Sequence, residues 1–483
     1  MAKEKRGKKK IQKKEHRVRH PILFLIIIAF VGSASLFFFI PGWMSYEHYI
    51  ETDREVVEVK TNDKEKVEGE IEPEEVIEEK KVVYEDIPNY IPIPKPLKSI
   101  YMSQCVVGTP SFRNDLVELI EETELNSVII DIKDYTGKIA FDTDHPDLVK
   151  SVSNECGARD MKSFIDTLHS KGIYVIGRIT VFQDPYYSIA YPELAVKFET
   201  PEGAVWKDGK GLSFIDVGAE PFWEYIVTLS LESYKFGFDE LNYDYIRFPS
   251  DGPMSNIRFD WAGNKEKQVA LEEFFVYLHK EMKNPDNYPK GVNPPVISAD
   301  LFGMVTTNHD DLNIGQVLER ALPYFDYIAP MVYPSHYPDG FNGWSDPNTV
   351  PYELIKFVMD SAVRRTVATE SYAQSFDSKP IYKDVIVPPT SSTTATTTKK
   401  VATGKYTKRS YDKNKIRPWL QDFDYPVEYT AQDVRAQIEA TYDAGLDSWM
   451  LWAPSNRYTR SALESVEVSE TASSENVESG LNT

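Results

Sequence analysis

Short apolar segments alternate with longer helical segments along most of this chain. Segments typical of buried strands span residues 100–106, 127–134, 174–182, 238–249, 296–303, 327–334, 416–425 and 448–454. Between them, apolar residues spaced three and four positions apart predict helices over residues 112–124, 158–171, 220–236, 265–283, 312–322, 351–365 and 431–444. The chain therefore alternates strand and helix until eight strands have been counted.

Eight strands that alternate with helices are the number that closes a (β/α)8 barrel. An open, doubly wound sheet is the alternative, and it normally carries a glycine-rich turn after its first strand. No such turn follows residues 100–106. We therefore predict an α/β fold, a (β/α)8 TIM barrel over residues 99–464. A low-complexity insertion at residues 366–415 interrupts the pattern, and its core, which reads PPTSSTTATTTKK, is expected to form a mobile loop.

The beginning of the chain combines a basic segment with an uncharged one. Residues 1–20 hold ten Lys or Arg and two Glu, and residues 21–40 hold no charged residue. An apolar stretch of this length is sufficient to span a bilayer, and its basic flank is typical of the cytoplasmic side. We expect a single transmembrane signal anchor at residues 21–42, with the following domain outside the cytoplasm. A cleaved signal peptide is the alternative, because Ser33-Ala34-Ser35 resembles a cleavage site.

The remainder of the chain is strongly acidic. The net charge is −21, and the first twenty residues contribute +8, so the other residues carry −29. A domain of this charge repels nucleic acid, and we expect no nucleic-acid partner. Residues 43–98 are predicted to form an acidic, proline-rich stalk, and residues 465–483 an acidic disordered tail.

Two cysteines limit the chemistry that the chain can use. Cys105 and Cys156 are the only cysteines, which excludes a disulfide-rich scaffold and a Cys-based zinc site. One disulfide and two buried thiols are both compatible with the sequence. We expect no metal and no cofactor.

The central strand carries the strongest indication of a functional site. Its sequence is FDELNYDYIRFP, and period-two alternation places Glu240, Asn242 and Asp244 on one face. Carboxylates and amides along one face of a buried strand are costly unless that face lines a solvated or functional cavity. In a barrel, functional side chains gather at the carboxyl ends of the strands. Other polar or aromatic residues predicted at those ends are Asp131, Lys133, Asp134, Arg178, Arg247, Asp300, Tyr333, Gln421, Asp422 and Trp452.

Carboxylates framed by aromatic residues suit the cleavage of glycosidic bonds. One carboxyl group protonates the leaving oxygen, while the other attacks the anomeric carbon or activates water. We predict Asp244 as nucleophile or base, Asp300 as proton donor, and Asp422 as the group that orients the sugar or stabilises charge. Substrate contacts are expected from Asp131, Lys133, Asp134, Arg178, Asn242, Arg247, Tyr333, Gln421 and Trp452. The alternative for Asp244 is a buried ion pair with Arg178 or Arg247, and Asp131 and Lys133, two apart on one face, could likewise pair.

Five stretches resemble the bacterial glycoside-hydrolase-like barrels of an uncharacterised-domain family. They are SVIIDIKD, GRITVFQDP, FDELNYDYIRFP, RPWLQDFDY and SWMLWAPSNRY, and the resemblance covers residues 101–458 in this order. It implies a glycosidase-type barrel, often secreted or membrane-anchored, that acts on a polysaccharide or oligosaccharide. In alpha-amylase-like barrels, the essential carboxylates also stand on strands four, five and seven. Asp244, Asp300 and Asp422 fall on those strands, although that family has a Glu where this chain has Asp300.

The functional hypothesis is therefore a membrane-anchored glycoside hydrolase that acts on an extracellular or cell-envelope glycan. The alternative is a non-catalytic module on the same scaffold, which would bind a glycan or attach to the envelope. The two hypotheses differ in geometry. Two carboxyl groups roughly 5–10 Å apart in one open cleft favour hydrolysis, whereas carboxylates held in salt bridges favour binding.

Overall fold

The computed structural model describes residues 87–388 and 396–466. The expected anchor at residues 21–42, residues 43–86 of the stalk and residues 467–483 of the tail lie outside the described residues. Within the described ranges, no helix is both long and apolar enough to cross a membrane.

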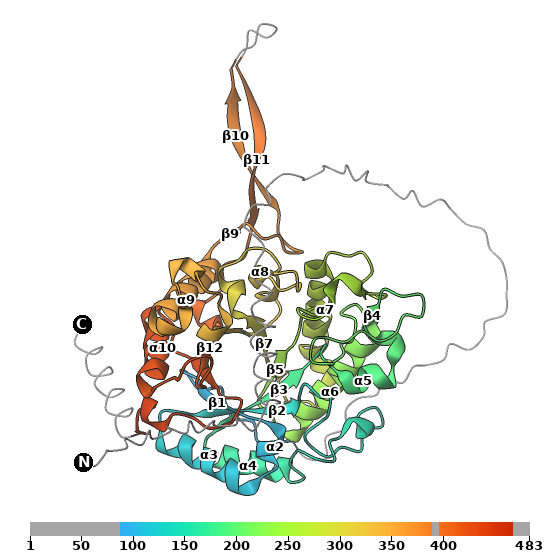
Figure 1. Cartoon of the computed structure of the whole chain (residues 1–483), viewed down its shortest axis with the longest axis vertical. Coiled ribbons are helices and arrows are strands. Elements are labelled where there is room, and N and C mark those ends of the chain that lie inside the picture. The colour runs from blue at the N-terminus through green and yellow to red at the C-terminus, as the bar shows by residue number, and fades with distance from the viewer. Residues whose placement is uncertain (1–86, 389–395, 467–483) are drawn as a thin grey trace, which may run out of the picture. The chain divides into compact units, whose positions relative to one another are not determined.

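Eight parallel strands close into a barrel (Figure 1). They are β1 (Lys98–Met102), β2 (Ser127–Lys133), β3 (Tyr174–Thr180), β5 (Glu240–Asp244), β7 (Val296–Phe302), β8 (Tyr327–Met331), β12 (Trp419–Gln421) and β13 (Trp449–Trp452). Each strand pairs in parallel with the next of the barrel strands in chain order, and β13 pairs with β1 to close the ring. The (β/α)8 barrel predicted from the sequence is confirmed.

Six of the seven predicted helices are observed close to their expected bounds, one is wrong in its first half, and two short helices were not predicted. The α-helices of the described residues are α2 (Gln104–Val107), α3 (Pro110–Glu122), α4 (Met161–Ser170), α5 (Pro185–Ala190), α6 (Glu220–Phe236), α7 (Lys267–Met282), α8 (Leu318–Ala321), α9 (Pro351–Val367) and α10 (Ala431–Asp443). The helix predicted over residues 312–322 is wrong for its first half. Leu312, Asn313 and Gly315 adopt positive φ angles of 51°, 56° and 87°, which a right-handed helix does not allow.

Side chains of β5 alternate between two buried regions, which are the inside of the barrel and the layer between strands and helices. Leu241 and Tyr243 are fully buried in the layer between strands and helices, where the Tyr243 hydroxyl donates to Ser230 of α6 at 3.0 Å. Glu240, Asn242 and Asp244 point into the barrel, as their alternation predicted. Near the strand starts, Glu240 forms a fully buried ion pair with Arg417. This pair fills the inside of the barrel near the strand starts. Asn242 and Asp244 lie nearer the carboxyl end of β5.

The two cysteines form a disulfide between α2 and the loop that precedes α4. The Cα atoms of Cys105 and Cys156 lie 4.4 Å apart. Cys105 is exposed and Cys156 is half-buried, so the alternative of two buried thiols is wrong. The bond closes a long stretch of chain around β2, and such closure reduces the entropy of the unfolded state.

The insertion at residues 366–415 contains two long strands, and residues 389–395 of its predicted mobile core lie outside the described residues. Strands β10 (Pro380–Val387) and β11 (Thr397–Thr407) pair in antiparallel register, and β11 also pairs with the short β9 (Glu370–Ser371). Runs of Val, Ile, Tyr and Thr on both sides of the low-complexity core favour strands, and these runs decided the local structure. The hairpin extends away from the barrel (Figure 1).

We expect that the hairpin contributes little to the stability of the barrel. The Thr407 amide donates a hydrogen bond to the Lys379 carbonyl at 2.8 Å. Because these two residues lie so close together, two glycines can replace residues 380–406 between them. Most side chains of β10 and β11 are exposed, and their removal takes few apolar contacts from the core. The melting temperature should change by less than about 4 °C, which is roughly 2 kcal/mol for a large domain. A larger loss in a thermal melt would mean that the hairpin packs against the barrel.

Candidate active site

Arg178 of β3 lies at the centre of a group of buried carboxylates inside the barrel. Its Nη1 lies 2.6 Å from Asp131 Oδ1, its Nη2 is paired with Asp244, and its Nε lies 3.7 Å from Asp300 Oδ2. Strand register produces this meeting, because Asp131 on β2 stands beside Arg178, and Asp244 ends the neighbouring strand β5. All four side chains are buried. We call these four residues the Arg178 cluster.

Asp300 is the carboxyl group in the cluster that most resists ionisation. Burial and the charge of Asp244 together raise its pKa to about 8, against the opposing effect of Arg178. Its Oδ1 accepts hydrogen bonds from Asn242 Nδ2 at 2.9 Å and from the Trp419 indole at 2.8 Å. A carboxyl group with this pKa holds a proton at neutral pH and has one to donate.

Asp244 has different surroundings. Its carboxylate accepts hydrogen bonds from Arg178 and from the amide nitrogen of Tyr245 at 2.5 Å. Tyr245 has a φ of 52°, in the left-handed region that a bulky residue rarely adopts. Strained backbone of this kind is concentrated at functional sites. The chain turns sharply at Tyr245, and this turn places an amide donor against the Asp244 carboxylate.

Aromatic rings border the cluster. The Tyr101 hydroxyl donates to Asp131, and the Tyr101 ring lies 4.2 Å from that of Trp452, centroid to centroid. The guanidinium of Arg178 lies 5.3 Å from the Trp452 ring, and Trp419 stands perpendicular to Trp452. Burial raises the pKa of Asp131 to about 6, partly opposed by Arg178. Burial also raises the pKa of Tyr333 well above its usual value, and the charges of Asp300 and Asp244 contribute, so Tyr333 belongs beside the cluster.

Two residues of this site were missed in the sequence. Tyr101 and Trp419 both donate a hydrogen bond to a carboxyl group of the cluster. Tyr101 lies near the end of the first predicted strand, and Trp419 lies two residues before Gln421 in the seventh. Alternation along the strand was the available signal, but it does not distinguish a ring facing the site from one facing the helices.

Lys133 does not share a face with Asp131, so that expectation is wrong. The pairing of β2 with β3 shifts register between Asp131 and Lys133, and such an irregularity turns the following side chain away. The Lys133 ammonium instead lies 2.8 Å from Asp184 Oδ2 and donates to the Thr180 carbonyl at 2.5 Å. Lys133 therefore joins the end of β2 to the start of the loop after β3, outside the Arg178 cluster.

Asp422 and Gln421, the site residues predicted on the seventh strand, form hydrogen bonds with neighbouring loops. Asp422 accepts hydrogen bonds from Thr459 N at 2.9 Å and Thr459 Oγ1 at 2.6 Å, and burial raises its pKa. Gln421 accepts from Ser335 N at 3.2 Å and donates to the carbonyl of Phe423 at 3.0 Å. Among the described residues, no hydrogen bond or ion pair joins either side chain to the Arg178 cluster. The catalytic role of Asp422 stays a prediction.

Asp134 and Arg247 lie near the cluster without joining it. Asp134 accepts from Thr136 N at 2.9 Å, and its charge contributes to the raised pKa of Asp131. Arg247 donates to the Phe248 carbonyl at 3.0 Å, and its guanidinium lies 4.8 Å from the Tyr245 ring and 4.9 Å from the Phe302 ring. No carboxylate within the described chain forms an ion pair with Arg247.

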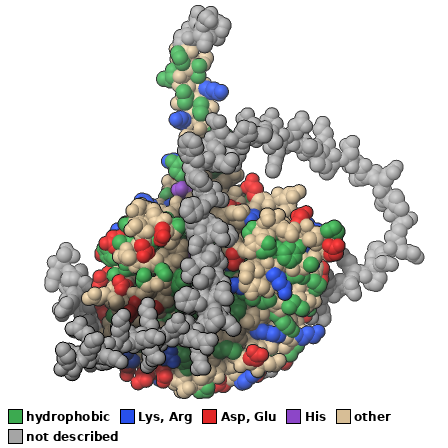
Figure 2. Space-filling view, viewed as in Figure 1, with side chains coloured by type: hydrophobic (Ala, Val, Ile, Leu, Met, Phe, Trp, Pro, Cys, Tyr) green, Lys and Arg blue, Asp and Glu red, His purple; other side chains and the backbone are tan. Residues whose placement is uncertain are grey.

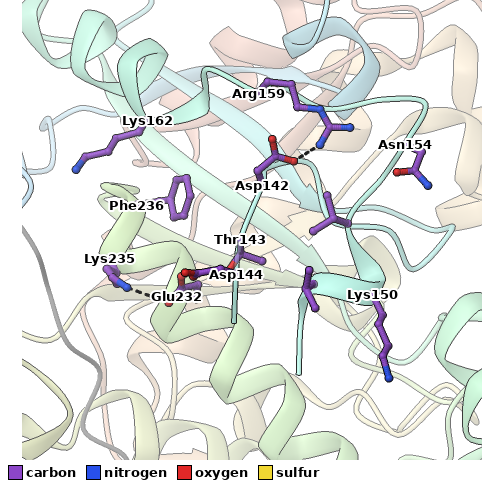
Figure 3. Close-up of a pocket in the computed structure, with 12 residues that line it drawn as sticks. Asp142, Thr143, Asp144, Lys150, Asn154, Arg159, Lys162, Glu232, Lys235 and Phe236 are labelled. Carbon is purple, nitrogen blue, oxygen red and sulfur yellow. Dashed lines mark hydrogen bonds and ion pairs between the residues drawn. The ribbon is translucent and has the colours of Figure 1, made fainter. Parts of the chain in front are cut away.

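A cavity of about 830 Å³ lies elsewhere, between the loop after β2, the start of α4 and the end of α6 (Figure 3). Some of its charged residues pair with each other, as Asp142 with Arg159 and Glu232 with Lys235. Its wall contains exposed carboxylates and no residue of the Arg178 cluster. We place the candidate active site at the strand ends, because buried carboxyl groups with raised pKa values occur there and not in this cavity.

A closed (β/α)8 barrel with carboxyl groups gathered among aromatic rings at its strand ends has the construction of a glycosidase-type barrel. The comparison of families agrees with this class. The family described as "Putative glycosyl hydrolase domain" matches residues 99–390 and 384–458, and the chain belongs to it. The resemblance stated from the sequence motifs is thus confirmed.

Several solved structures are similar to the chain, whereas no curated protein matches it. A hypothetical protein from Ruminiclostridium thermocellum is 28% identical, with 44% of this chain and 98% of that chain covered and a TM-score of 0.36. The PgaB (BpsB) glycoside hydrolase domain from Bordetella bronchiseptica is 14% identical, with 76% and 99% covered and a TM-score of 0.46. The glycoside hydrolase domain of PelA from Pseudomonas aeruginosa is 11% identical, with 76% and 97% covered and a TM-score of 0.36.

Proposed function

We propose that the barrel hydrolyses a glycan with Asp244 as nucleophile or base and Asp300 as proton donor. One observation carries the proposal. Asp244 and Asp300 contact the same buried guanidinium, yet the pKa of Asp300 is raised to about 8, while Asp244 accepts two hydrogen bonds as a carboxylate. A carboxyl group with a raised pKa, next to one that accepts hydrogen bonds from a cation and a backbone amide, is a usual arrangement for acid and base catalysis.

The other residues of the cluster serve these two groups. Arg178 fixes the Asp244 carboxylate and limits the mutual repulsion of the acids. Asn242 and Trp419 hold one oxygen of Asp300, which leaves the other oxygen to carry the proton. The half-buried Trp452 ring supplies flat apolar surface of the kind that packs against sugar rings. In this arrangement Asp300 protonates the leaving oxygen while Asp244 attacks or activates water.

A non-catalytic glycan-binding module is the second candidate, and one observation favours it. Each of the three carboxylates in the cluster lies within 4 Å of a guanidinium nitrogen of Arg178, and salt-bridged carboxylates are typical of structural or binding sites. The release of reducing ends from bacterial exopolysaccharides and peptidoglycan glycans distinguishes the candidates, because a binding module releases none.

Because Asp300 is the proposed proton donor, we expect the rate of hydrolysis to depend on pH. Hydrolysis by the wild type should fall as the pH rises through about 8, because Asp300 then loses the proton that it donates. Asp300→Asn should lower turnover at every pH and remove this limb of the profile. Initial rates between pH 5 and 9, measured on any glycan that the wild type cleaves, test the assignment. A limb near pH 8 that persists in the Asn variant would assign the proton to another group.

Thermal melts of the same two proteins check the assignment independently of activity. The folded pKa of Asp300, about 8, lies above the usual value near 4 for an unfolded Asp. The folded state therefore keeps a proton that the unfolded chain has released. The stability due to this group is fully present below about pH 4 and is lost as the pH rises through 8. The melting temperature of the wild type relative to Asp300→Asn should thus fall between pH 5 and 9.

We also propose that the protein is anchored in a membrane through residues 21–42, with the barrel outside the cytoplasm. The uncharged stretch behind a basic segment supports this proposal, as does the Cys105–Cys156 disulfide, since disulfides persist in oxidising compartments. Protease added to intact cells should digest the barrel and spare residues 1–20. A soluble chain that begins near Ser35 would indicate a cleaved signal instead.

A further inference from the structure

The arm formed by β10 and β11 exposes apolar side chains without a core of its own. Tyr382 is 56% exposed and Ile386 is 70% exposed, and Val385 and Val401 are also exposed. A two-stranded ribbon is marginally stable in water, and exposed apolar surface that is rimmed by charge marks an interaction site. Figure 2 shows apolar and basic side chains next to each other along the arm. The arm therefore has the features of a contact surface.

The arm is basic on an acidic protein. Between residues 379 and 409 there is one acid, Asp384, and there are seven cations, whereas the chain as a whole has a net charge of −21. The cations are Lys379, Lys383, Lys399, Lys400, Lys405, Lys408 and Arg409. Charge of one sign gathered on one projecting element favours a ligand of the opposite sign.

Two of these cations, Lys405 and Lys408, already have partners within the protein at the base of the arm. Lys405 pairs with Glu370 at 3.2 Å, and the Lys408 ammonium donates to the carbonyls of Thr366 and Ala368. Within the described ranges, Lys383 and Lys399 have no carboxylate at ion-pair distance, nor does Lys400, although Asp384 is its register partner on β10. Three lysines farther along the arm are therefore available to a ligand.

Strand register distributes charge and apolar surface over both faces. On one face, Lys383 stands opposite Val401 and Lys399 opposite Val385, and Tyr382 and Ile386 share the other face with Lys400. A membrane-surface element needs one face that is apolar throughout, and neither face of the arm is. A ligand that fits both faces carries anionic groups and apolar faces in alternation. Acidic sugars have this chemistry, because each carboxylate is attached to a ring with apolar faces.

We propose that the β10–β11 arm binds an anionic polysaccharide whose sugars carry carboxylates. The choice of a glycan over other polyanions rests on the proposed function of the barrel. The acidic remainder of the chain repels the same polymer, so the arm supplies the main electrostatic attraction for it. The arm holds a long chain close to the barrel without taking part in bond cleavage.

Binding of polygalacturonate to the full-length protein tests the proposal. Asp244→Asn serves as the background, so that hydrolysis does not consume the probe, and neutral dextran serves as the uncharged polymer. Lys383→Gln/Lys399→Gln/Lys400→Gln should weaken polygalacturonate binding by about tenfold at low salt and by less at high salt, because salt screens the contacts. The control is Lys150→Gln/Lys162→Gln/Lys290→Gln, which removes three exposed lysines outside the arm and should leave affinity unchanged.

Three outcomes would overturn the proposal. They are equal affinities of the arm and control variants for polygalacturonate, equal binding of dextran and polygalacturonate, and tighter arm-dependent binding of duplex DNA or anionic lipid vesicles. The chain in which two glycines replace residues 380–406 provides a second variant, and its melting temperature shows whether the barrel is intact. Hydrolysis of short oligosaccharides by the arm variants is a separate measurement. Loss of binding with hydrolysis retained supports the arm, and absence of hydrolysis in the wild type contradicts the proposed function alone.

Discussion

Asp244→Asn should lower glycan hydrolysis by about 10,000-fold or more while glycan binding survives. The carboxylate acts in the transition state, whereas the amide that replaces it has nearly the same shape and still accepts hydrogen bonds. Arg178 keeps Asp131 and Asp300 as partners in the variant, so the fold should persist with a moderate loss of stability. Reducing-end release, an affinity measurement and a thermal melt on the same preparation report the three quantities.

Asp422→Asn is the matched comparison for this experiment. Asp422 is 5% exposed and Asp244 is 4% exposed, yet the hydrogen bonds of Asp422 go to Thr459. The Asn variant of Asp422 should keep most of the activity if the Arg178 cluster performs the chemistry. Equal losses in the two variants would instead support the three-carboxylate arrangement predicted from the sequence. Hydrolysis at the wild-type rate by Asp244→Asn would remove Asp244 from catalysis.

Arg178→Met should destabilise the barrel by about 3–5 kcal/mol, because it leaves Asp131, Asp244 and Asp300 buried without their cation. For a domain of this size, the melting temperature should fall by about 6 °C or more. The loss should be smaller at pH 5 than at pH 8. At the lower pH the carboxyl groups take up protons, and the repulsion among them decreases.

Arg247→Met provides the control for this loss. Arg247 is about as buried as Arg178, but its guanidinium contacts a carbonyl, a hydroxyl and aromatic rings and forms no ion pair within the described residues. Its replacement should cost less stability, with little difference between pH 5 and pH 8. If the destabilisation caused by Arg178→Met does not depend on pH, it reflects lost packing, and the electrostatic role of Arg178 is contradicted.

The arrangement of the cluster explains how one barrel could combine an acid and a base. Three acids share one cation, so they cannot all be charged at low cost in a buried site. Asp244 takes a hydrogen bond from Arg178 and another from a strained backbone amide, and Asp300 retains its proton. The division of roles that we propose thus follows from unequal access to positive charge, and Asp244→Asn and Arg178→Met both act on that division.

Much of the fold was readable in the sequence because it depends on local patterns. Alternation of apolar and polar residues along β5 predicted the inward face of Glu240, Asn242 and Asp244. The helix over residues 220–236 was predicted with its observed bounds, since Gly237, with a φ of 114°, ends α6. The local pattern failed at residues 312–322, where the backbone adopts positive φ angles. The strands β10 and β11 were missed although their runs of Val, Ile, Tyr and Thr favour strands.

The sequence by itself determined the eight barrel strands and most of the helices between them, the position of Asp131, Arg178, Asp244 and Asp300 near strand ends, and the acidic charge of the chain outside its basic start. These properties depend on residue type and spacing along the chain, which a sequence contains in full. The tertiary structure alone decided that Arg178 holds three carboxylates, that Lys133 turns away to Asp184 and that Tyr101 and Trp419 bind the cluster. Those contacts depend on strand register and barrel closure, which bring together side chains from distant parts of the chain. The raised pKa of Asp300 has the same origin, since burial and the charge of Asp244 exist only once β5 and β7 lie side by side.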